Sequence, residues 1–464
     1  MLPTRVQRLF APDSDAMALA GLFGEAGHEL YLVGGSVRDA ILDRAHEDLD
    51  FATNARPEAV KELVGPWSDA LFTAGELFGT VSVVKGGHTY EITTYRSEVY
   101  RDESRQPSVE FADDIETDLS RRDFSVNAMA LRLAPDVTEP ELVDPWGGLA
   151  DLGAMVLRTP LSPEISFGDD PLRMLRLFRF QATLGFEIDA AAAAAASAMS
   201  GRLTIVSAER IRDEFSKLMT APEPSGALRG LVDSGLAAEF IPELPALGLA
   251  HDPHHRHKDV LAHTLAVVDK TPPELVIRLA ALYHDVGKPE TREFGPGGSV
   301  TFHHHEVVGA RMTRRRLRAL RYPKQIVEDV SQLVYLHMRP HTFKDGWTDR
   351  AVRRYVRDAG HQLDDLNLLV RSDVTTRNAK LERAIQRRID ELEDRIAELR
   401  EKEELDRLRP PIDGNEVMAH LDIPPGPRIG AAMKLLLEHR IDEGPYSPEE
   451  AFELLDQWVE EGKI

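Results

Sequence analysis

Two aspartates, Asp48 and Asp50, are spaced so that they could share a metal ion. Residues at i and i+2 of a strand point from the same face, and paired carboxylates bind hard cations such as Mg2+. About a dozen residues earlier, an apolar run ends at Gly34 and Gly35, where backbone N–H groups suit a triphosphate and Arg38 adds positive charge. An isolated Asp-x-Asp is more often an exposed strand edge. The combination predicts two-metal phosphoryl transfer.

A second pattern joins one acid to a basic stripe. Asp170 precedes Pro171, as an N-cap precedes a first-turn proline, and Arg173, Arg176 and Arg179 then recur every three residues on an apolar helix. Buried arginines require anions, so the stripe predicts nucleotide contacts. A carboxylate beside a guanidinium complements the edges of C and A, whereas G and U would leave groups unpaired at about 1–3 kcal/mol each. Asp170 with Arg173 is therefore predicted to select CTP and ATP.

A third pattern is a set of histidines and aspartates in the predicted helices of residues 251–378. The adjacent pair His284 and Asp285 offers one nitrogen and one oxygen ligand from a single turn. His263 and Asp373 can complete a four-ligand metal site that leaves positions open for water. Each histidine alone is more typical of a surface or core residue, but the spacing favours a divalent metal site.

The first two patterns belong to five ordered motifs that resemble class II tRNA nucleotidyltransferases, the CCA-adding enzymes and their poly(A) polymerase relatives. The motifs occupy residues 34–39, 48–50, 121–130, 144–151 and 169–176. The resemblance implies that Gly35, Arg38 and Arg122 hold the nucleotide. It also suggests Glu91 as a third carboxylate, although a strand glutamate paired with a nearby arginine is an equal alternative. Asp169 stands where the family commonly has Glu.

The resemblance also implies an activity, the template-independent addition of C, C and A to the 3′ end of tRNA. CTP and ATP would be the substrates, Mg2+ the cofactor at Asp48 and Asp50, and pyrophosphate the leaving group. One alternative is a poly(A) polymerase or an enzyme that adds only part of CCA. Another is a nucleotide phosphohydrolase in which the histidine-rich region carries the function.

The histidine-rich region resembles the HD superfamily of metal-dependent phosphohydrolases. The residues that match in order are His263, His284, Asp285, His305, His337 and Asp373. Among His303, His304 and His305, the resemblance favours His305. An intact site with a second divalent metal could hydrolyse phosphate ends such as 2′,3′-cyclic phosphates. The equal alternative is a retained scaffold.

These residues must be positioned by an α/β head followed by helices. Short β-like runs alternate with helical patches to about Leu152, and a glycine pair at 86–87 predicts a hairpin turn. The polar stretch 97–118 predicts a mobile loop, and Arg210 is expected to hold neck helices together. The predicted domains are a mixed-sheet nucleotidyltransferase head, 1–152, a helical neck and body, 153–250, an α-helical HD domain, 251–380, and a helical arm and tail that contacts tRNA, 381–464.

Composition limits the remaining functions. The 464 residues carry a net charge of -22, which argues against diffuse adhesion to nucleic acid, and they include no cysteine for disulfides. No run approaches the roughly 18 apolar residues of a membrane span, so a cytoplasmic protein without a membrane partner is expected. Six arginines between Arg311 and Arg321 form one basic run. Such a run is usually a solvated face, and here it is a candidate for tRNA backbone contact.

Overall fold

The computed structural model describes residues 3–44, 48–99, 108–135, 140–250, 259–295, 300–375, 379–403 and 408–464. The chain divides into two compact units, Met1–Pro245 and Ala246–Ile464. The predicted head and neck lie in the first unit apart from residues 246–250, and the predicted HD domain, arm and tail lie in the second. None of the described helices combines the length and the apolar character that a bilayer crossing requires.

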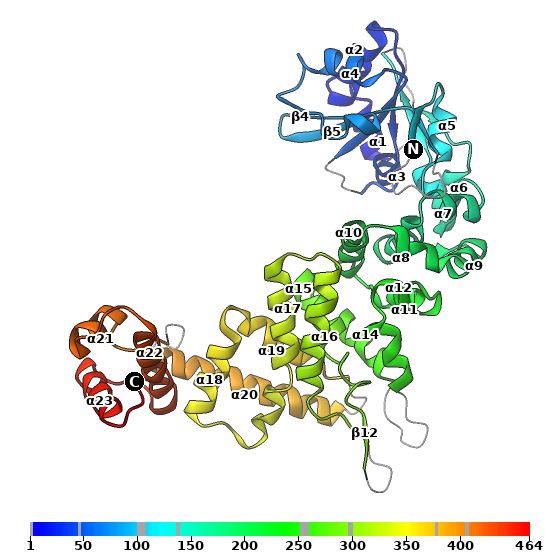
Figure 1. The fold of residues 1–464 in the computed structure, drawn as a ribbon. Helices are drawn as coiled ribbons and strands as arrows, with labels where there is room; N and C mark the ends of the chain where they lie inside the picture. The colour runs from blue at the N-terminus through cyan, green and yellow to red at the C-terminus, as the bar shows by residue number, and fades with distance from the viewer. Residues whose placement is uncertain are drawn as a thin grey trace. The chain divides into compact units, whose positions relative to one another are not determined.

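A seven-stranded mixed sheet forms the head of the first unit, in the order β3-β4-β5-β2-β1-β8-β9 (Figure 1). Its strands are β1 Leu30–Val33, β2 Leu49–Thr53, β3 Ala70–Phe72, β4 Thr80–Lys85, β5 His88–Thr94, β8 Ala130–Leu133 and β9 Glu141–Val143. β2 and β5 run parallel, and the other neighbours run antiparallel. Gly86 and Gly87 turn β4 into β5 with φ of 58° and 83°, which confirms the predicted hairpin.

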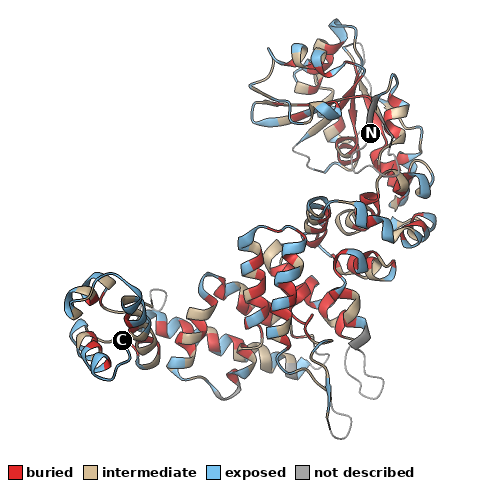
Figure 2. Ribbon diagram, viewed as in Figure 1, coloured by how far each residue is buried: buried red, intermediate tan, exposed pale blue. Residues whose placement is uncertain are grey.

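Short helices cover this sheet, and buried residues line it (Figure 2). The head helices are α1 Thr4–Leu9, α2 Asp15–Glu25, α3 Gly35–Ile41, α4 Pro57–Val64, η1 Glu76–Phe78, α5 Ile115–Ser120, η2 Ser125–Asn127 and α6 Gly148–Ala154. The following helices, with one short strand pair, are β10 Val156–Leu157, α7 Pro163–Asp169, α8 Leu172–Leu184, β11 Glu187–Ile188, α9 Ala190–Ala198, η3 Ser200–Ile205, α10 Ala208–Met219, α11 Ser225–Asp233, α12 Leu236–Phe240 and α13 Glu243–Ala246.

The stretch predicted as a loop is partly regular. β6 (Arg96–Val99) and β7 (Ser108–Phe111) pair antiparallel, and α5 follows. The prediction of a loop throughout 97–118 was therefore wrong at both ends, because cross-strand hydrogen bonds form a strand pair whose polar sequence lacks clear alternation. Residues 100–107, the middle of that stretch, lie outside the described residues.

The second unit is helical, as predicted, apart from one small strand pair. Its elements are η4 Leu247–Ala250, α14 Val260–Lys270, α15 Leu275–Tyr283, β12 Glu293–Phe294, β13 Val300–Thr301, α16 His305–Ala319, α17 Lys324–Leu336, η6 Pro340–Asp345, α18 Asp349–Ala359, η7 Gly360–Gln362, α19 Leu363–Ser372, α20 Ala379–Glu403, α21 Gly414–Leu421, α22 Pro427–Glu443 and α23 Pro448–Glu460. Helices α21 to α23 enclose a small core of their own around Val417, Leu436 and Leu455. Residues 251–258, which open the predicted histidine-rich region, lie outside the described residues.

Candidate active site and metal centre

Three carboxylates gather where β2 and β5 run side by side. Asp48 immediately precedes β2, Asp50 lies within it, and the parallel register sets Asp50 beside Glu91 of β5. The Ser36 hydroxyl accepts a hydrogen bond from Asp50 N at 3.1 Å and donates one to Asp48 O at 3.3 Å, which ties α3 to this end of the strand. The two β-strands therefore place the predicted metal ligands together.

The pKa of Glu91 reflects the closeness of the three carboxylates. Desolvation raises the pKa of Glu91, and the charges of Asp50 and Asp48 raise it further. Mutual repulsion among three carboxylates is relieved by a divalent cation, whose preferred ligands are carboxylate oxygens. The donor set therefore fits Mg2+, and the neighbours that act on Glu91 are the two aspartates rather than an arginine.

The glycine turn brings its backbone against a guanidinium. Gly34 has φ 71° and precedes α3, and a Cβ there would lie 2.6 Å from Arg122 Nη1. Only glycine suits that conformation and that approach. Arg122 Nη2 donates to Asp118 at 3.1 Å, while the buried Arg122 Nε has no hydrogen-bond partner among the described residues. Burial alone would raise the pKa of Asp118, but Arg121 and Arg122 lower it.

Arg38 is less available than the sequence predicts. Its Nε and Nη2 each donate to an Asp39 carboxylate oxygen at 2.8 Å, and its Nη1 donates to Asn127 Oδ1 at 2.6 Å. The guanidinium is therefore bonded to protein groups inside the head. Nucleotide binding by Gly35 and Arg38 stays a prediction, because these contacts alone do not place a triphosphate.

Asp170 forms its ion pair with a different arginine from the one expected. Arg210 Nη2 of α10 donates to Asp170 Oδ2 at 2.7 Å, and Leu172 N donates to Asp170 Oδ1 at 3.1 Å. Arg173 instead donates to Ser166 O at 3.2 Å, to Ser166 Oγ at 3.1 Å and to the carbonyl of Arg121. Sequence reasoning assigned Arg210 a packing role, and this contact adds it to the candidate base-reading residues.

The remaining arginines of the α8 stripe contact protein carboxylates. Arg176 donates to Asp123 Oδ2 through Nε at 2.8 Å and Nη2 at 2.5 Å, and through Nη1 to Glu214 Oε1 at 3.0 Å. Arg179 Nε lies 2.8 Å from Glu214 Oε2. Burial lowers the pKa of Arg179 to about 10, with repulsion from Arg176 adding to the effect. The anions that these buried arginines require are therefore present in the protein, and nucleotide binding by Arg176 and Arg179 stays a prediction.

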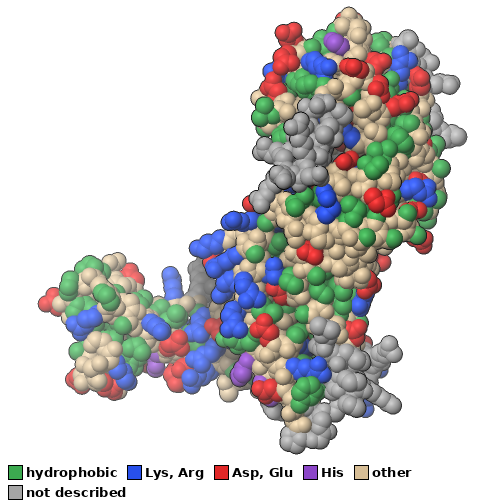
Figure 3. Space-filling view, turned by 45° about the vertical axis from the view of Figure 1, so that its right-hand side comes forward, with side chains coloured by type: hydrophobic (Ala, Val, Ile, Leu, Met, Phe, Trp, Pro, Cys, Tyr) green, Lys and Arg blue, Asp and Glu red, His purple; other side chains and the backbone are tan. Residues whose placement is uncertain are grey.

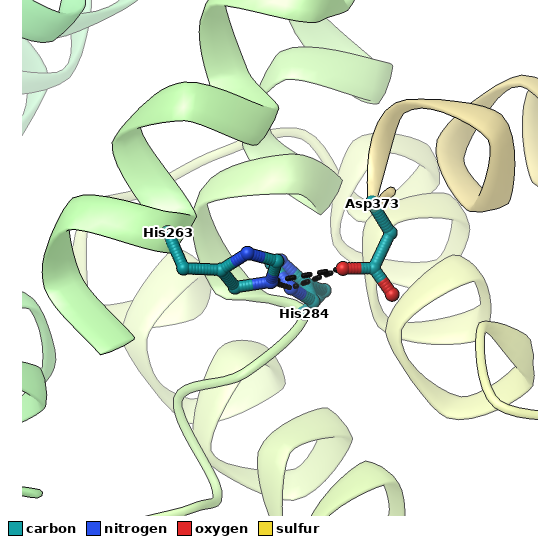
Figure 4. A group of neighbouring side chains, drawn as sticks. All are labelled: His263, His284 and Asp373. Atoms are coloured by element: carbon teal, nitrogen blue, oxygen red, sulfur yellow. Dashed lines mark hydrogen bonds and ion pairs between the residues drawn. The ribbon is translucent and has the colours of Figure 1, made fainter. Parts of the chain in front are cut away.

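In the second unit, all six predicted metal ligands converge. Two groups each bring three ligand atoms within 4.8 Å of one another: His263, His284 and Asp373 in one, and Asp285, His305 and His337 in the other. Figure 4 shows the first group, in which Asp373 Oδ1 lies 2.9 Å from His263 Nε2 and 3.5 Å from His284 Nε2. Asp285 Oδ2 lies 3.2 Å from His284 Nε2, so the two groups adjoin.

All four histidines are held through the nitrogen that faces away from the cluster. Nδ1 of His284, His305 and His337 lies 2.6 to 2.9 Å from the carbonyl oxygens of Ala281, Phe302 and Val334 respectively. His263 Nδ1 lies 2.6 Å from the hydroxyl of Thr375. Such bonds fix the tautomer that offers Nε2 to a metal.

The cluster also contains polar atoms whose bonding is incomplete. Nε2 of His305 and Nε2 of His337 are buried without a hydrogen-bond partner among the described residues. Burial lowers the pKa of His337 to about 3, with repulsion from His284 adding to it. For His284, burial acts in the same direction, but the charges of Asp285 and Asp373 raise its pKa to about 10. The pKa of His305 is lowered as well, so the inward Nε2 atoms of His305 and His337 are neutral and lie beside carboxylates, as the donor set of a transition-metal site requires.

Two further residues lie at this centre: His341, which the sequence did not predict, and Lys288, which the sequence places one turn after the His284-Asp285 pair. His341 of η6 places Nε2 3.3 Å from Asp373 Oδ2. Lys288 Nζ donates to Asp285 Oδ2 at 2.6 Å and contributes to holding the pKa of that carboxyl below its usual range. Lys288 was visible as the cation one turn after His284, whereas nothing in the spacing of His341 separates it from a surface histidine.

Three segments of this chain match known protein families. Residues 30–158 match a family described as "Poly A polymerase head domain", and residues 185–247 match "Probable RNA and SrmB- binding site of polymerase A". Residues 256–399 match the HD domain, which extends the predicted region into α20.

Curated relatives match over different lengths. An A-adding tRNA nucleotidyltransferase of Deinococcus radiodurans is 33% identical over 445 residues, covering 93% of this chain and 95% of that protein. A CCA-adding enzyme of Streptococcus gordonii is 39% identical over 241 residues, covering 52% of this chain and 58% of its own length. The chain thus aligns with little more than half of that CCA-adding relative.

Solved structures share the fold. The CCA-adding enzyme of Bacillus stearothermophilus in complex with CTP superimposes with a TM-score of 0.66 at 23% identity, covering 100% of this chain and 99% of that one. The Thermotoga maritima CCA-adding enzyme complexed with tRNA gives a TM-score of 0.58 at 17% identity, covering 99% and 96%. Together with the full-length Deinococcus relative and the matched head domain, this places the chain in the tRNA nucleotidyltransferase and poly(A) polymerase family.

Proposed function

We propose that this protein adds C, C and A to the 3′ end of tRNA, using CTP and ATP without a nucleic-acid template and releasing pyrophosphate. The observation that carries the proposal is the gathering of Asp48, Asp50 and Glu91 on adjacent strands, with the Gly34 turn and Arg122 in the same head. Membership of the family supports the reaction class.

The residues divide the work of nucleotidyl transfer. Asp48 and Asp50, with Glu91 beside them, would hold Mg2+, which supplies activation of the attacking 3′-hydroxyl and neutralises charge on the triphosphate. The Gly34 backbone and the Nε of Arg122, which has no partner among the described residues, offer donors for phosphate oxygens. Asp170 with Arg173 or Arg210 would read the base edge, because an acceptor beside a donor matches C and A.

Primer extension tests this proposal. Transfer RNAs that lack one, two or three terminal nucleotides are incubated with CTP and ATP, separately and together, with Mg2+. The wild type is expected to restore CCA on all three, and the double variant Asp48→Ala with Asp50→Ala to lose incorporation by at least about a thousandfold, as removal of catalytic metal ligands does. Incorporation that survives in the double variant would refute the proposal.

Addition of A alone is the second candidate, because a relative that matches 93% of this chain is an A-adding enzyme. The same assay separates the two activities. An A-adding enzyme extends only tRNA that already ends in CC, whereas a CCA-adding enzyme also consumes CTP on shorter tRNAs. A poly(A) polymerase would instead extend beyond one A.

For the second unit we propose a metal-dependent phosphohydrolase that acts on phosphate ends such as 2′,3′-cyclic phosphates. The inward Nε2 atoms of His305 and His337 and the two adjoining three-ligand groups support it. The expected result is hydrolysis of a 2′,3′-cyclic nucleotide with added Mn2+, Co2+ or Ni2+, lost in the variant His284→Ala with Asp285→Ala. That variant is expected to keep tRNA extension, which assigns the two activities to separate sites. Absence of hydrolysis in the wild type with every metal would leave the HD domain as a scaffold.

A further inference from the structure

One helix of the second unit carries a dense positive stripe. Between Val307 and Val327 the chain has seven cationic side chains and no acidic one, in a protein whose net charge is -22. Arg311, Arg314, Arg315 and Arg318 recur at intervals of three and four along α16, so they lie on one face. All four are exposed, and Figure 3 presents a face of this unit on which Lys and Arg side chains gather.

The opposite face of α16 is fixed in the core of the unit. Met312, Thr313 and Leu317 are buried, so the helix cannot rotate to hide its arginines. Within the described residues, the side chains of Arg314, Arg315 and Arg318 form no hydrogen bond or ion pair, and the ion pair of Arg311 is with Glu290, at 3.9 Å across exposed surface. The described part of the protein therefore provides little neutralising charge for this stripe.

The charge continues past the end of the helix. Arg318, Arg321 and Lys324 line a hollow of 340 Å³ between the end of α16 and the start of α17, together with Tyr322 and one carboxylate, Glu328. Glu328 lies 3.7 Å from Lys324, so the hollow keeps a net positive charge. Two neighbouring features, a stripe and a hollow, thus present cations to one anionic partner.

We propose that this α16 stripe, Arg311, Arg314, Arg315 and Arg318 with Arg321 and Lys324, binds the sugar-phosphate backbone of the tRNA substrate. The inference rests on the proposed function, because that function supplies a polyanion with regularly repeated charges. Successive turns of α16 repeat the guanidinium groups about every 5.4 Å along the helix, so several of them can face a polyanion at once. Like charges at these spacings destabilise a helix, so the stripe costs stability that a bound polyanion would recover.

The test uses the full-length protein and tRNA that lacks CCA, with binding measured by fluorescence anisotropy from 50 to 300 mM KCl. The triple variant Arg314→Gln, Arg315→Gln and Arg318→Gln is expected to raise the Kd for tRNA by at least about tenfold at the lowest salt. Its slope of log affinity against log salt should fall by about 2 to 3, because each lost phosphate contact removes about 0.7 to 0.9. The KM for CTP should stay at the wild-type value, and the Tm should stay the same or rise.

The matched control is the triple lysine variant at the same three positions, which keeps the charge and is expected to bind tRNA within about threefold of the wild type. A glutamine variant with wild-type Kd and salt slope would overturn the inference. Binding of polyglutamate, a model acidic polypeptide, is measured in the same way. A glutamine variant that loses polyglutamate binding but keeps tRNA binding would assign the stripe to an acidic protein and also overturn the inference. A wild-type protein that binds tRNA through the stripe but extends none would refute the proposed function and leave this inference standing.

Discussion

Glu91 shows how a candidate metal site sets one carboxylate beside two others. Its backbone position is fixed by the register of β5 with β2, and no side chain among the described residues donates a hydrogen bond to its carboxylate. Asp50 and Asp48 raise the free energy of its charged form, as does desolvation. A site that concentrates negative charge in this way is less stable without a cation and gains more when one binds.

The substitution Glu91→Gln should therefore stabilise the metal-free protein at neutral pH while slowing nucleotide addition. The folded pKa of Glu91 lies above its ordinary 4.5, so the stability linked to its proton is fully present below pH 4.5 and is lost as pH rises through the folded pKa. Thermal melts in EDTA from pH 4 to 8 should show a higher Tm for the variant at pH 7 and no difference at pH 4. Added Mg2+ should raise the Tm of the wild type more than that of the variant. Equal melting curves at pH 7 would contradict this account.

At the scale of elements, α8 joins the head to the helices that follow it through buried charge. Arg176 of α8 contacts Asp123 near the start of η2 and Glu214 of α10, so one side chain links three segments. Burial alone would raise the pKa of Asp123, but Arg176 and the bond from Asn127 lower it well below its usual range. The stripe that predicted a nucleotide site is thus, in part, a structural connection.

Replacing Arg176 by Met should destabilise the first unit by about 3–5 kcal/mol, because Asp123 would remain buried without its main partner. The control Arg132→Met removes an exposed pair with Glu141 and should cost less than about 1 kcal/mol. Urea unfolding at pH 7 measures both. The stability linked to Asp123 is present above pH 3.8 and is lost as pH falls through its folded pKa, so the wild type should lose more stability on acidification than Arg176→Met.

The turn after the His284-Asp285 pair is packed against the first turn of α16. A Cβ on Gly287 would lie 2.1 Å from the carbonyl oxygen of His305, whereas on Gly309 the nearest atoms would be 3.4 Å away. Gly287→Ala should therefore displace His305 and lower Mn2+ affinity by about 10- to 100-fold, as loss of ligand positioning does. Gly309→Ala is the matched control with a smaller effect. Calorimetric titration that finds the same affinity in both variants would argue against this positioning role.

Local patterns explain which elements could be predicted. Alternating apolar residues predict β4 and β5, and charge over apolar spacing predicts the long helix α20, because those elements bury one face. Short apolar runs predict β1 and β8, which are buried almost throughout. The contact of Asp170 with Arg210 spans 40 residues, and that of His263 with Thr375 spans 112. Partner choice over such distances depends on how helices pack, which spacing along one chain does not encode.

At the scale of the whole molecule, two compact units are joined in one chain. The first unit ends at Pro245, and each of the two units contains its own candidate metal ligands. The two proposed activities therefore have separate structural supports. A ligand that binds one unit need not stabilise the other.

Scanning calorimetry should resolve two unfolding transitions, and Mn2+ should mainly raise the Tm of the transition that belongs to the second unit. At a concentration of 100 Kd, one bound ion adds about 2.7 kcal/mol to the stability of the unit that holds it. The variant His263→Ala with His284→Ala should lose that shift while keeping the transition of the first unit. A single transition that moves as a whole with Mn2+ would show that the units unfold together.

The anchoring of the four histidines has a consequence for how the metal centre can change. The rings of His284, His305 and His337 are hydrogen-bonded to main-chain carbonyls, which a side-chain substitution does not remove. The ring of His263 is instead held by a side-chain hydroxyl, that of Thr375. Among these four contacts, position 375 is thus the one place where a side-chain substitution can alter how the rings are held. Replacing Thr375 by Ser or Val would change the metal preference of the group formed by His263, His284 and Asp373 and leave that of the Asp285, His305 and His337 group unchanged.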